Sequence, residues 1–401
     1  MRVRPRALGV ALAILLSLLL PAAGHSATTV ASHFRLAIDR AAASADFSRT
    51  PARSRYVILQ GWQAPLARRL KAANPGLRVL VYKNLSFMTE RDAAGRSSTG
   101  VATQDAQAHP EWYLRDAAGR PVVSRRYDWL AAADVGDPGY QVRWADNVLA
   151  EVRREGWDGV MADDANPTME WHFDHADVLR YPTPAAWQQA TGAALAAIGA
   201  RFRSAGRLVF GNFGFWKSYP AVVSGWLRHV DGGLEEWFVK TGTTGARDSY
   251  IGGRLWEIGL QQVKDTEAQG KAFLGITHSA NGDAAAARYG WATLLLAAGG
   301  RSSFALHEDY ANENWFPEYE YDLGEPLEAE SAEPTGVHRR RFANGLVLVN
   351  PSSASARVSF GGVYSGSGLP RSSGAEMSPR SALVLRRNGG RRPARRARAA
   401  L

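Results

Sequence analysis

Two similar acidic runs in the middle of the chain hold the side chains best suited to chemistry. The first, Gly156-Trp-Asp-Gly-Val-Met-Ala-Asp-Asp164, is a short apolar segment that ends in two carboxylates. The second is Asp231-Gly-Gly-Leu-Glu-Glu236, and in both runs an acid follows five residues after the aspartate of an Asp-Gly pair. Carboxylates at the carboxyl end of a buried strand are typical of the active sites of (β/α)8 barrel enzymes.

The alternation of side chains along a strand selects one acid from each run. If both runs are strands, Asp163 lies on the side of Met161, and Glu236 lies on the side of Leu234. Two such carboxylates at one barrel mouth could cleave a glycosidic bond, because one can protonate the leaving oxygen while the other attacks C1 or activates water. The distance between the two carboxyl groups would decide between retention and inversion.

The remaining acids of the two runs have simpler interpretations. Asp164 and Glu235 point to the opposite sides of their strands, so we expect each to support a neighbour. The doubled glutamate leaves the register open by one residue, and Glu235 is therefore an alternative to Glu236 as the acid. Asp163 itself could instead cap the next helix or pair with a buried arginine.

Strand-like apolar segments alternate with helix-like segments from about residue 55 to residue 309. Asp137-Pro138 and Thr183-Pro184 are N-caps followed by a first-turn proline, and Gly156 and Gly206 end the two helices. Eight strand–helix units predict a closed (β/α)8 TIM barrel, whereas an open doubly wound sheet is the alternative. The expected strands span residues 56–61, 79–82, 130–135, 159–162, 208–212, 230–234, 272–276 and 302–306.

Most of the expected strands end in polar or aromatic residues, always at the same end. A barrel interior that turns polar at strand after strand predicts a mouth suited to a polar ligand. The chain also has 13 Trp and 13 Tyr, and aromatic rings can pack on the apolar C–H faces of pyranoses. We therefore expect a sugar to bind at the mouth, although any one of these side chains could be purely structural. The candidate substrate-binding residues are Gln60, Trp62, Lys83, Asn84, Asn166, Asn212, Trp216, His278, His307, Glu308 and Asp309.

The composition changes after Leu323, where a small all-β unit begins. Asn344-Gly345 is a strong hairpin signal between segments 336–342 and 346–350, and further strands are expected at 357–360 and 382–385. The stretch 86–127 fits no single helix, so we expect a long loop that forms part of the substrate-binding wall. The expected regions are a signal peptide at 1–26, a catalytic barrel at 30–325, a sandwich-like β domain at 326–388 and a disordered arginine-rich tail at 389–401.

The N-terminal segment has the features of an export signal. Three arginines precede the apolar run 7–20, and small residues follow it at 22–24. The run is short for a membrane span, so we expect cleavage between Gly24 and Ala27 and no stable membrane span afterwards. An uncleaved anchor is the alternative. The signal predicts a protein that is secreted or associated with the cell envelope.

The net charge of +10 comes from the two ends of the chain. Three arginines lie in residues 2–6 and seven in residues 386–398, and neither segment contains an acid. The remainder is close to neutral, so nothing favours a nucleic-acid partner. The C-terminal arginines could contact an anionic wall polymer, or they could be solvated without a partner.

Several classes of chemistry lack their sequence signals. The chain has no cysteine, which removes disulfides and thiolate metal sites. No Gly-x-Ser-x-Gly elbow, Walker A loop or His-Glu-x-x-His motif occurs. We therefore expect neither a cofactor nor a metal, and we expect a monomer.

The first acidic run resembles the fourth-strand signature Phe-Asp-Gly-Val-Phe-Leu-Asp-Asp of hypothetical glycosyl hydrolase family 15, a group with a TIM barrel. Supporting stretches lie at 79–84, 110–114, 137–138, 231–236 and 341–350, so the resemblance covers most of residues 55–350. The chain is similar, more distantly, to the endo-α-1,4-polygalactosaminidases. In those relatives an aspartate ending strand four and a glutamate ending strand six are the expected catalytic pair. The resemblance therefore implies Asp163 as the nucleophile and Glu236 as the general acid/base.

These observations predict a secreted glycoside hydrolase that cleaves a polysaccharide or oligosaccharide by a retaining mechanism with two carboxylates. The first alternative is a non-catalytic carbohydrate-binding or cell-envelope protein on a degenerate barrel. The second is a metal-dependent hydrolase such as a deacetylase, with Asp163, Asp164 and either His172 or His307 as ligands. The spacing of these residues matches no standard metal motif.

Overall fold

The computed structural model describes residues 30–244 and 248–387 of the chain. The expected signal peptide and the expected arginine-rich tail lie outside these ranges, and the domain boundaries stay a prediction. Within the two described ranges, none of the helices has both the length and the apolar character that a membrane span requires.

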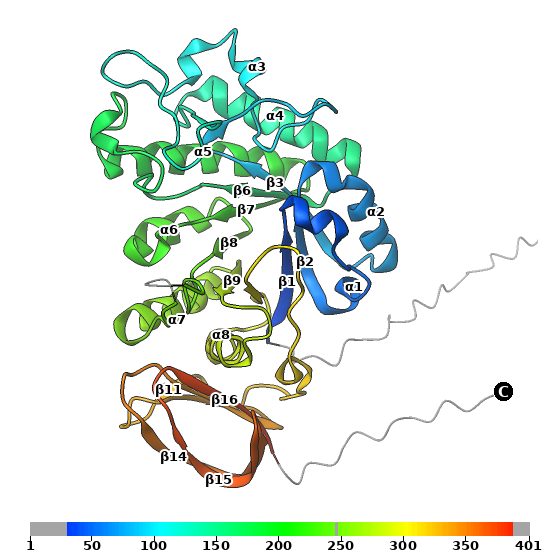
Figure 1. Ribbon diagram of the computed structural model, residues 1–401, viewed down its shortest axis with the longest axis vertical. Helices are drawn as coiled ribbons and strands as arrows, with labels where there is room; N and C mark the ends of the chain where they lie inside the picture. Colours follow the sequence, from blue (N-terminus) through cyan, green and yellow to red (C-terminus); the bar gives the residue numbers. More distant parts are fainter. Residues whose placement is uncertain (1–29, 245–247, 388–401) are drawn as a thin grey trace, which may run out of the picture.

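Eight parallel strands close into a barrel, and the helices that connect them lie on its outside (Figure 1). Around the barrel the strands follow their order along the chain, and the last strand pairs with the first. This arrangement confirms the predicted (β/α)8 class. The barrel strands are β1 (Ser32–Ala37), β2 (Ser54–Leu59), β3 (Arg78–Asn84), β6 (Gly159–Asp163), β7 (Leu208–Asn212), β8 (Gly232–Glu235), β9 (Ala272–His278) and β10 (Ser303–His307).

The helices begin and end largely where the sequence signals place them. The side chain of Asp137 accepts a hydrogen bond from the backbone N–H of Tyr140 at the start of α4, and Gly156 ends this helix with a φ of 80°. Thr183 caps α5 in the same way. The helices are α1 (Thr50–Arg53), α2 (Ala64–Ala73), α3 (Thr103–Ala106), α4 (Pro138–Glu155), α5 (Pro184–Ser204), α6 (Pro220–Leu227), α7 (Gly253–Ala268) and α8 (Ala284–Ala297).

One predicted strand is wrong, and one barrel strand was missed. In the segment 130–135 only β5 (Ala131–Ala132) forms, and it pairs with β4 (Phe87–Met88) in the long loop between β3 and β6. The true first strand is β1, whose outward-facing His33 and Arg35 hide its apolar pattern. Arg35 is buried because its guanidinium donates hydrogen bonds to backbone and side-chain oxygens of neighbouring loops.

The barrel interior is a closed apolar core made of every second residue of the strands. Met161 of β6 and Leu234 of β8 both lie in this core, as strand parity predicts. The residues two positions further along these strands are Asp163 and Glu236. The packed interior therefore places these two side chains directly above it. The buried residues of the interior are Phe34, Leu36, Ile58, Leu80, Met161, Phe210, Leu234, Ala272, Leu274, Ile276 and Ala305.

The chain continues from the barrel into an antiparallel six-stranded sheet with the strand order β11-β12-β13-β16-β14-β15 (Figure 1). The hairpin predicted around Asn344-Gly345 forms between β12 and β13. Sequence reasoning missed β15, which contains few apolar residues. The strands are β11 (Ser331–Ala332), β12 (His338–Arg341), β13 (Gly345–Asn350), β14 (Ala356–Gly366), β15 (Leu369–Met377) and β16 (Ser381–Arg387).

The sheet packs against α8, so that one apolar core runs from the barrel into the sheet. Val347 and Val349 of β13 belong to the core of the barrel layer, whereas Leu346 and Leu348 belong to the separate core of the sheet. Arg340 adds polar contacts at the same interface, because its Nη1 donates to the backbone oxygens of Leu295 (2.9 Å) and Ala298 (2.8 Å) at the end of α8.

We expect Arg340→Ala to lower the free energy of unfolding by about 1–3 kcal/mol, because the last turn of α8 loses a charged donor. The neighbouring Arg341 is the matched control, since its side chain is exposed and, among the described residues, forms its ion pair with Glu328 on the surface. Arg341→Ala should change the stability by less than about 1 kcal/mol. Urea unfolding of both variants checks this, and equal effects would contradict the assigned role of Arg340.

Candidate active site

Each of the eight barrel strands delivers a side chain to one cavity at the carboxyl ends of the strands. The cavity has a volume of about 580 Å³. A mouth of this kind is where (β/α)8 barrels bind their ligands. The side chains that come from or directly follow the strands, in the order β1 to β10, are Asp39, Gln60, Asn84, Asp163, Asn212, Glu236, His278 and His307.

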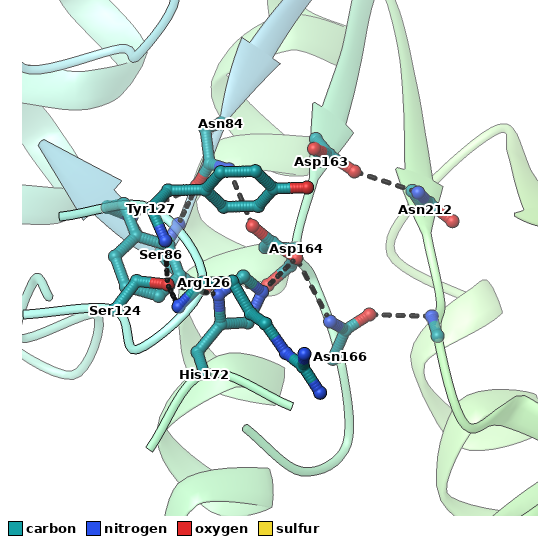
Figure 2. A network of polar contacts seen from close by, with 12 residues as sticks. Asn84, Ser86, Ser124, Arg126, Tyr127, Asp163, Asp164, Asn166, His172 and Asn212 are labelled. Atoms are coloured by element: carbon teal, nitrogen blue, oxygen red, sulfur yellow. Dashed lines mark hydrogen bonds and ion pairs between the residues drawn. The ribbon is translucent and has the colours of Figure 1, made fainter. Parts of the chain in front are cut away.

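Asp163 is the last residue of β6, and both of its carboxylate oxygens are held by donors from neighbouring strands. Its Oδ1 accepts a hydrogen bond of 2.8 Å from Nδ2 of Asn212, which ends β7. Its Oδ2 accepts a hydrogen bond from the hydroxyl of Tyr82 in β3. Figure 2 shows Asp163 and Asn212 facing each other across the two strands. These contacts fix the orientation of the carboxylate.

Glu236 directly follows β8 and lies in the same cavity. Its Oε1 accepts a hydrogen bond of 3.4 Å from the hydroxyl of Tyr310, and the amide of Asn212 also interacts with this carboxyl group. One asparagine therefore contacts the acids from both sequence runs. Oδ1 of Asn212 is buried and has no hydrogen-bond partner among the described residues.

The environments of the two acids move their pKa values apart. Burial, followed by the negative charge of Asp164, raises the pKa of Asp163 to about 6, although the hydrogen bonds from Tyr82 and Asn212 act in the opposite direction. Burial, followed by the charges of Asp163 and Asp164, raises the pKa of Glu236 to about 8. Near pH 7 the site therefore favours an ionised Asp163 beside a protonated Glu236.

Asp164 also lines the cavity, and its side chain contacts the surrounding loops (Figure 2). Its side chain accepts hydrogen bonds from Nδ2 of Asn84 (2.7 Å) and Nδ2 of Asn166 (3.2 Å), and Nε2 of His172 lies 3.2 Å from it. Its φ is 52°, in the left-handed region that aspartate tolerates better than most residues. The backbone turn at Asp164 is what separates the directions of the two neighbouring carboxylates.

Glu235 lies outside the cavity, so of the two consecutive glutamates only Glu236 lines it. It is buried in β8, and its Oε2 lies 3.2 Å from the ammonium of Lys217. Its Oε1 accepts a hydrogen bond from the backbone N–H of Trp237. Glu235 thus pairs with a lysine outside the barrel, and Glu236 is the glutamate that faces the cavity.

The structure brings most of the expected substrate-binding residues together and leaves four of them outside the cavity. The expected residues that line the cavity are Gln60, Asn84, Asn166, Asn212, His278, His307 and Glu308. The residues expected there that do not line it are Trp62, Lys83, Trp216 and Asp309.

Two of these corrections concern buried side chains. Lys83 points out of the barrel because it alternates with Tyr82 along β3, and its ammonium pairs with Glu151 of α4 at 2.8 Å. Trp216 is buried against the ring of Phe273 in the layer between the barrel and the helices. Both side chains lie on the far side of the barrel wall from the cavity.

The other two corrections concern loops. The carboxylate of Asp309 accepts hydrogen bonds from the backbone N–H groups of Ala311 (2.8 Å) and Asn312 (2.9 Å), so it orders its own loop. Trp62 begins the connection from β2 to α2 and is 37% exposed. Each follows a strand end closely in sequence, but neither of these two residues lines the cavity.

Sequence reasoning missed several cavity residues. Tyr82 has the same parity as Leu80 and Asn84 in β3, so alternation could have revealed it. Asp39 follows β1, the strand that was not recognised. Tyr127 ends the stretch that was expected to form part of the substrate-binding wall, but its local sequence did not single it out.

The side chains that a metal-dependent hydrolase would use as metal ligands form hydrogen bonds with other protein groups instead. His172 contacts Asp164 through Nε2 and the hydroxyl of Ser124 through Nδ1, at 3.2 and 2.9 Å. Across residues 30–244 and 248–387, histidines and acids form no group of three or more with the arrangement of metal ligands.

Comparisons with known proteins give one match over most of the chain. The family described as hypothetical glycosyl hydrolase family 15 matches residues 71–346, more than half of the 401 residues. No curated protein sequence gives a significant match.

Solved structures resemble the chain at low sequence identity. Amy13B of Eubacterium rectale has a TM-score of 0.50 and 10% identity, over 90% of this chain and 96% of its own. The glycoside hydrolase domain of PelA from Pseudomonas aeruginosa has a TM-score of 0.45 and 14% identity, over 70% of this chain and 96% of that domain. Ega3 of Aspergillus fumigatus, solved with galactosamine, has a TM-score of 0.45 and 10% identity, over 72% and 94% of the two chains. At 10% identity, the likeness to Amy13B concerns the fold alone.

We expect Asp164→Ala to lower the free energy of unfolding by about 2–4 kcal/mol, because three buried or half-buried polar partners lose their acceptor and alanine is strained at positive φ. Asp146→Ala is the control, since Asp146 is exposed on α4 and its ion pair among the described residues is with the exposed Arg201. Thermal and urea unfolding check the difference. A loss at Asp164 no larger than that at Asp146 would show that the hydrogen bonds of Asp164 do not hold the loops.

Proposed function

The chain belongs to hypothetical glycosyl hydrolase family 15 and is a glycosyl hydrolase, and we propose that it cleaves O-glycosidic bonds of a polysaccharide with Asp163 and Glu236 as the reacting carboxylates. One observation carries this proposal. Two carboxyl groups share one cavity and one asparagine, and their pKa values are raised by different amounts, so that one is ionised while the other keeps its proton.

In the first step, an oxygen of the Asp163 carboxylate attacks C1 of the bound sugar, and the bond between C1 and the leaving oxygen breaks. Glu236 gives its proton to that oxygen, so the leaving chain departs as an alcohol. Tyr82 and Asn212 hold the attacking carboxylate by hydrogen bonds, and Tyr310 holds Glu236.

In the second step, the now ionised Glu236 takes a proton from water, and the water oxygen attacks C1. The bond between C1 and Asp163 breaks, which restores the ionised aspartate and the protonated glutamate. This route retains the configuration at C1. Proton NMR of the first product formed tests it, because an inverted anomer would require a different mechanism.

The charge of the cavity favours a neutral or positively charged polysaccharide. Among the described residues that line the cavity there are five acids and no lysine or arginine. Burial lowers the pKa of His278 to about 4 and that of His307 to about 3, so neither histidine adds positive charge near pH 7. A polymer of uronic acids would be repelled.

The proposal also includes export of the enzyme to its polymer. The support is the sequence of residues 1–26, where arginines, an apolar run and small residues follow one another as in secretory signals. N-terminal sequencing of the protein recovered from outside the cell tests it, and an intact N-terminus there would contradict cleavage.

The main alternative is a protein that binds carbohydrate without cleaving it. Such a protein would not need the raised pKa of Glu236. This shift costs stability as the pH rises from the ordinary glutamate pKa toward about 8, because the unfolded chain releases a proton that the folded chain keeps. A metal-dependent hydrolase is the second alternative, and sensitivity to chelators distinguishes it.

We expect Asp163→Asn and Glu236→Gln each to reduce hydrolysis by at least about 10³-fold, because each removes one reacting carboxyl group. Reducing ends released from amylose, chitosan and alginate measure the activity, and alginate should not be cleaved. Glu170→Gln is the matched control, since Glu170 is exposed and lies outside the cavity. Full activity of either cavity variant in a folded protein would overturn its assigned role.

We expect kcat/KM to follow a bell-shaped pH profile. It should fall below about pH 6 as Asp163 gains a proton, and above about pH 8 as Glu236 loses one. With a substrate whose leaving group needs no proton, Glu236→Gln should keep the acid limb and lose the basic limb. A basic limb that persists in this variant would show that another group is the acid.

A further inference from the structure

An exposed tryptophan stands at the edge of the cavity. The side chain of Trp129 is the most exposed indole among the described residues, at 64%, and it lines the cavity. Most large aromatic side chains of the protein are buried in its core, as Trp144 and Trp157 are. An exposed indole keeps a large apolar surface in water, so it is a natural binding surface for a ligand with an apolar face.

Tyr127 connects this tryptophan to the carboxylates. The two aromatic rings lie 5.4 Å apart, and Figure 2 shows the Tyr127 hydroxyl directed toward the strand end that carries Asp163. Tyr127, Asp163 and Asp164 line the same cavity, and burial, followed by the charges of Asp164 and Asp163, raises the pKa of Tyr127. Tyr127 therefore lies beside the carboxylates, and Trp129 lies next to Tyr127 along the cavity edge.

A chain of hydrogen bonds links the loop of these two aromatics to Asp164 (Figure 2). His172 contacts Asp164 through Nε2 at 3.2 Å and the hydroxyl oxygen of Ser124 through Nδ1 at 2.9 Å. The same Ser124 oxygen accepts the backbone N–H groups of Arg126 (3.1 Å) and Tyr127 (3.2 Å). This chain of contacts from Asp164 through His172 to Ser124 fixes the turn just before Trp129.

Further contacts join the aromatic loop to the loop that follows β6. The backbone N–H of Arg125 donates to the backbone oxygen of His172 at 2.9 Å, and the guanidinium of Arg126 lies 4.0 Å from the ring centre of Trp171. Within the aromatic loop, the N–H of Leu130 donates to the oxygen of Tyr127 at 3.0 Å. The loop is thus ordered before any ligand binds, which reduces the entropy that binding would cost.

We propose that Trp129 is a stacking platform for a sugar unit of the polymer outside the subsite where the bond is cleaved, and that Ser124 and His172 are positioning residues for this platform. The inference rests on the proposed function, because it takes a polysaccharide as the ligand. A platform away from the reacting carboxylates binds long chains better than short ones. Trp129 therefore makes the affinity of the enzyme increase with the length of the polysaccharide chain.

Binding is the first test, in a background that cannot cleave. Asp163→Asn protein is titrated with size-fractionated chains of whichever polymer of the amylose, chitosan and alginate panel it binds. Trp129→Ala should weaken binding of the long chains about 10-fold, the size that one aromatic contact supports, and should weaken binding of the shortest chains less. Trp129→Phe should recover part of the loss.

Trp62→Ala is the matched control, because Trp62 is also an exposed tryptophan but lies outside the cavity. Equal affinities of Trp129→Ala and Trp62→Ala for long chains would overturn the platform while leaving the proposed hydrolysis intact. Binding without cleavage by the wild type would overturn the hydrolysis, and the same comparison would still decide the platform. Failure of all three polymers to bind would overturn both.

A double-mutant cycle tests the positioning role of Ser124. Ser124→Ala alone should reduce the preference for long over short chains several-fold, because the turn loses the acceptor that fixes it. In the Trp129→Ala background the same change should alter this preference less than about 2-fold. Equal effects in both backgrounds would show that Ser124 supports general stability and does not act through Trp129.

Discussion

The hydrogen bonds that Asp164 accepts are the contacts on which the rest of the site depends. They hold Asn84, Asn166 and His172, so the residue after β6 ties the end of β3 to the loops that follow β6. The negative charge of the same carboxylate is one cause of the raised pKa values of Asp163 and Glu236. A single side chain thus contributes both to the shape of the site and to the raised pKa values of its acids.

The site separates the pKa values of its acids with neutral partners. Tyr82 and Asn212 donate to Asp163, whereas Glu236 receives a long hydrogen bond from Tyr310. A lysine or arginine in the cavity would lower both pKa values, because a positive charge stabilises every nearby carboxylate. Such cations are placed behind the barrel wall instead, where Lys83 pairs with Glu151 and Lys217 pairs with Glu235. The charged pairs therefore support the barrel while the cavity stays acidic.

The barrel carries the cavity, whereas the C-terminal sheet packs against the outside of the barrel layer. None of the described cavity residues comes from the C-terminal sheet, which packs on α8 through β13 and β16. Part of the cavity wall comes from the loops after β3 and β6, where Tyr127, Trp129 and Trp171 lie. The order of these loops comes from hydrogen bonds within and between them, such as the contact between Ser124 and His172 and the bond from the Tyr127 N–H to Ser124.

The sequence by itself determined the class of fold and two acids that line the same cavity. Alternation along a strand is a local property, so Met161 and Leu234 predicted the sides of Asp163 and Glu236, and the caps at Asp137 and Thr183 predicted two helices. The register between Glu235 and Glu236, the outward direction of Lys83 and the strand β1 were decided by the closed barrel. The contacts of Tyr127 and Trp129 also depended on tertiary structure, because the loop that carries them is held by His172, which lies 48 residues from Ser124 along the chain. Contacts between distant segments leave no periodic signal in the sequence, so only the folded chain could place them.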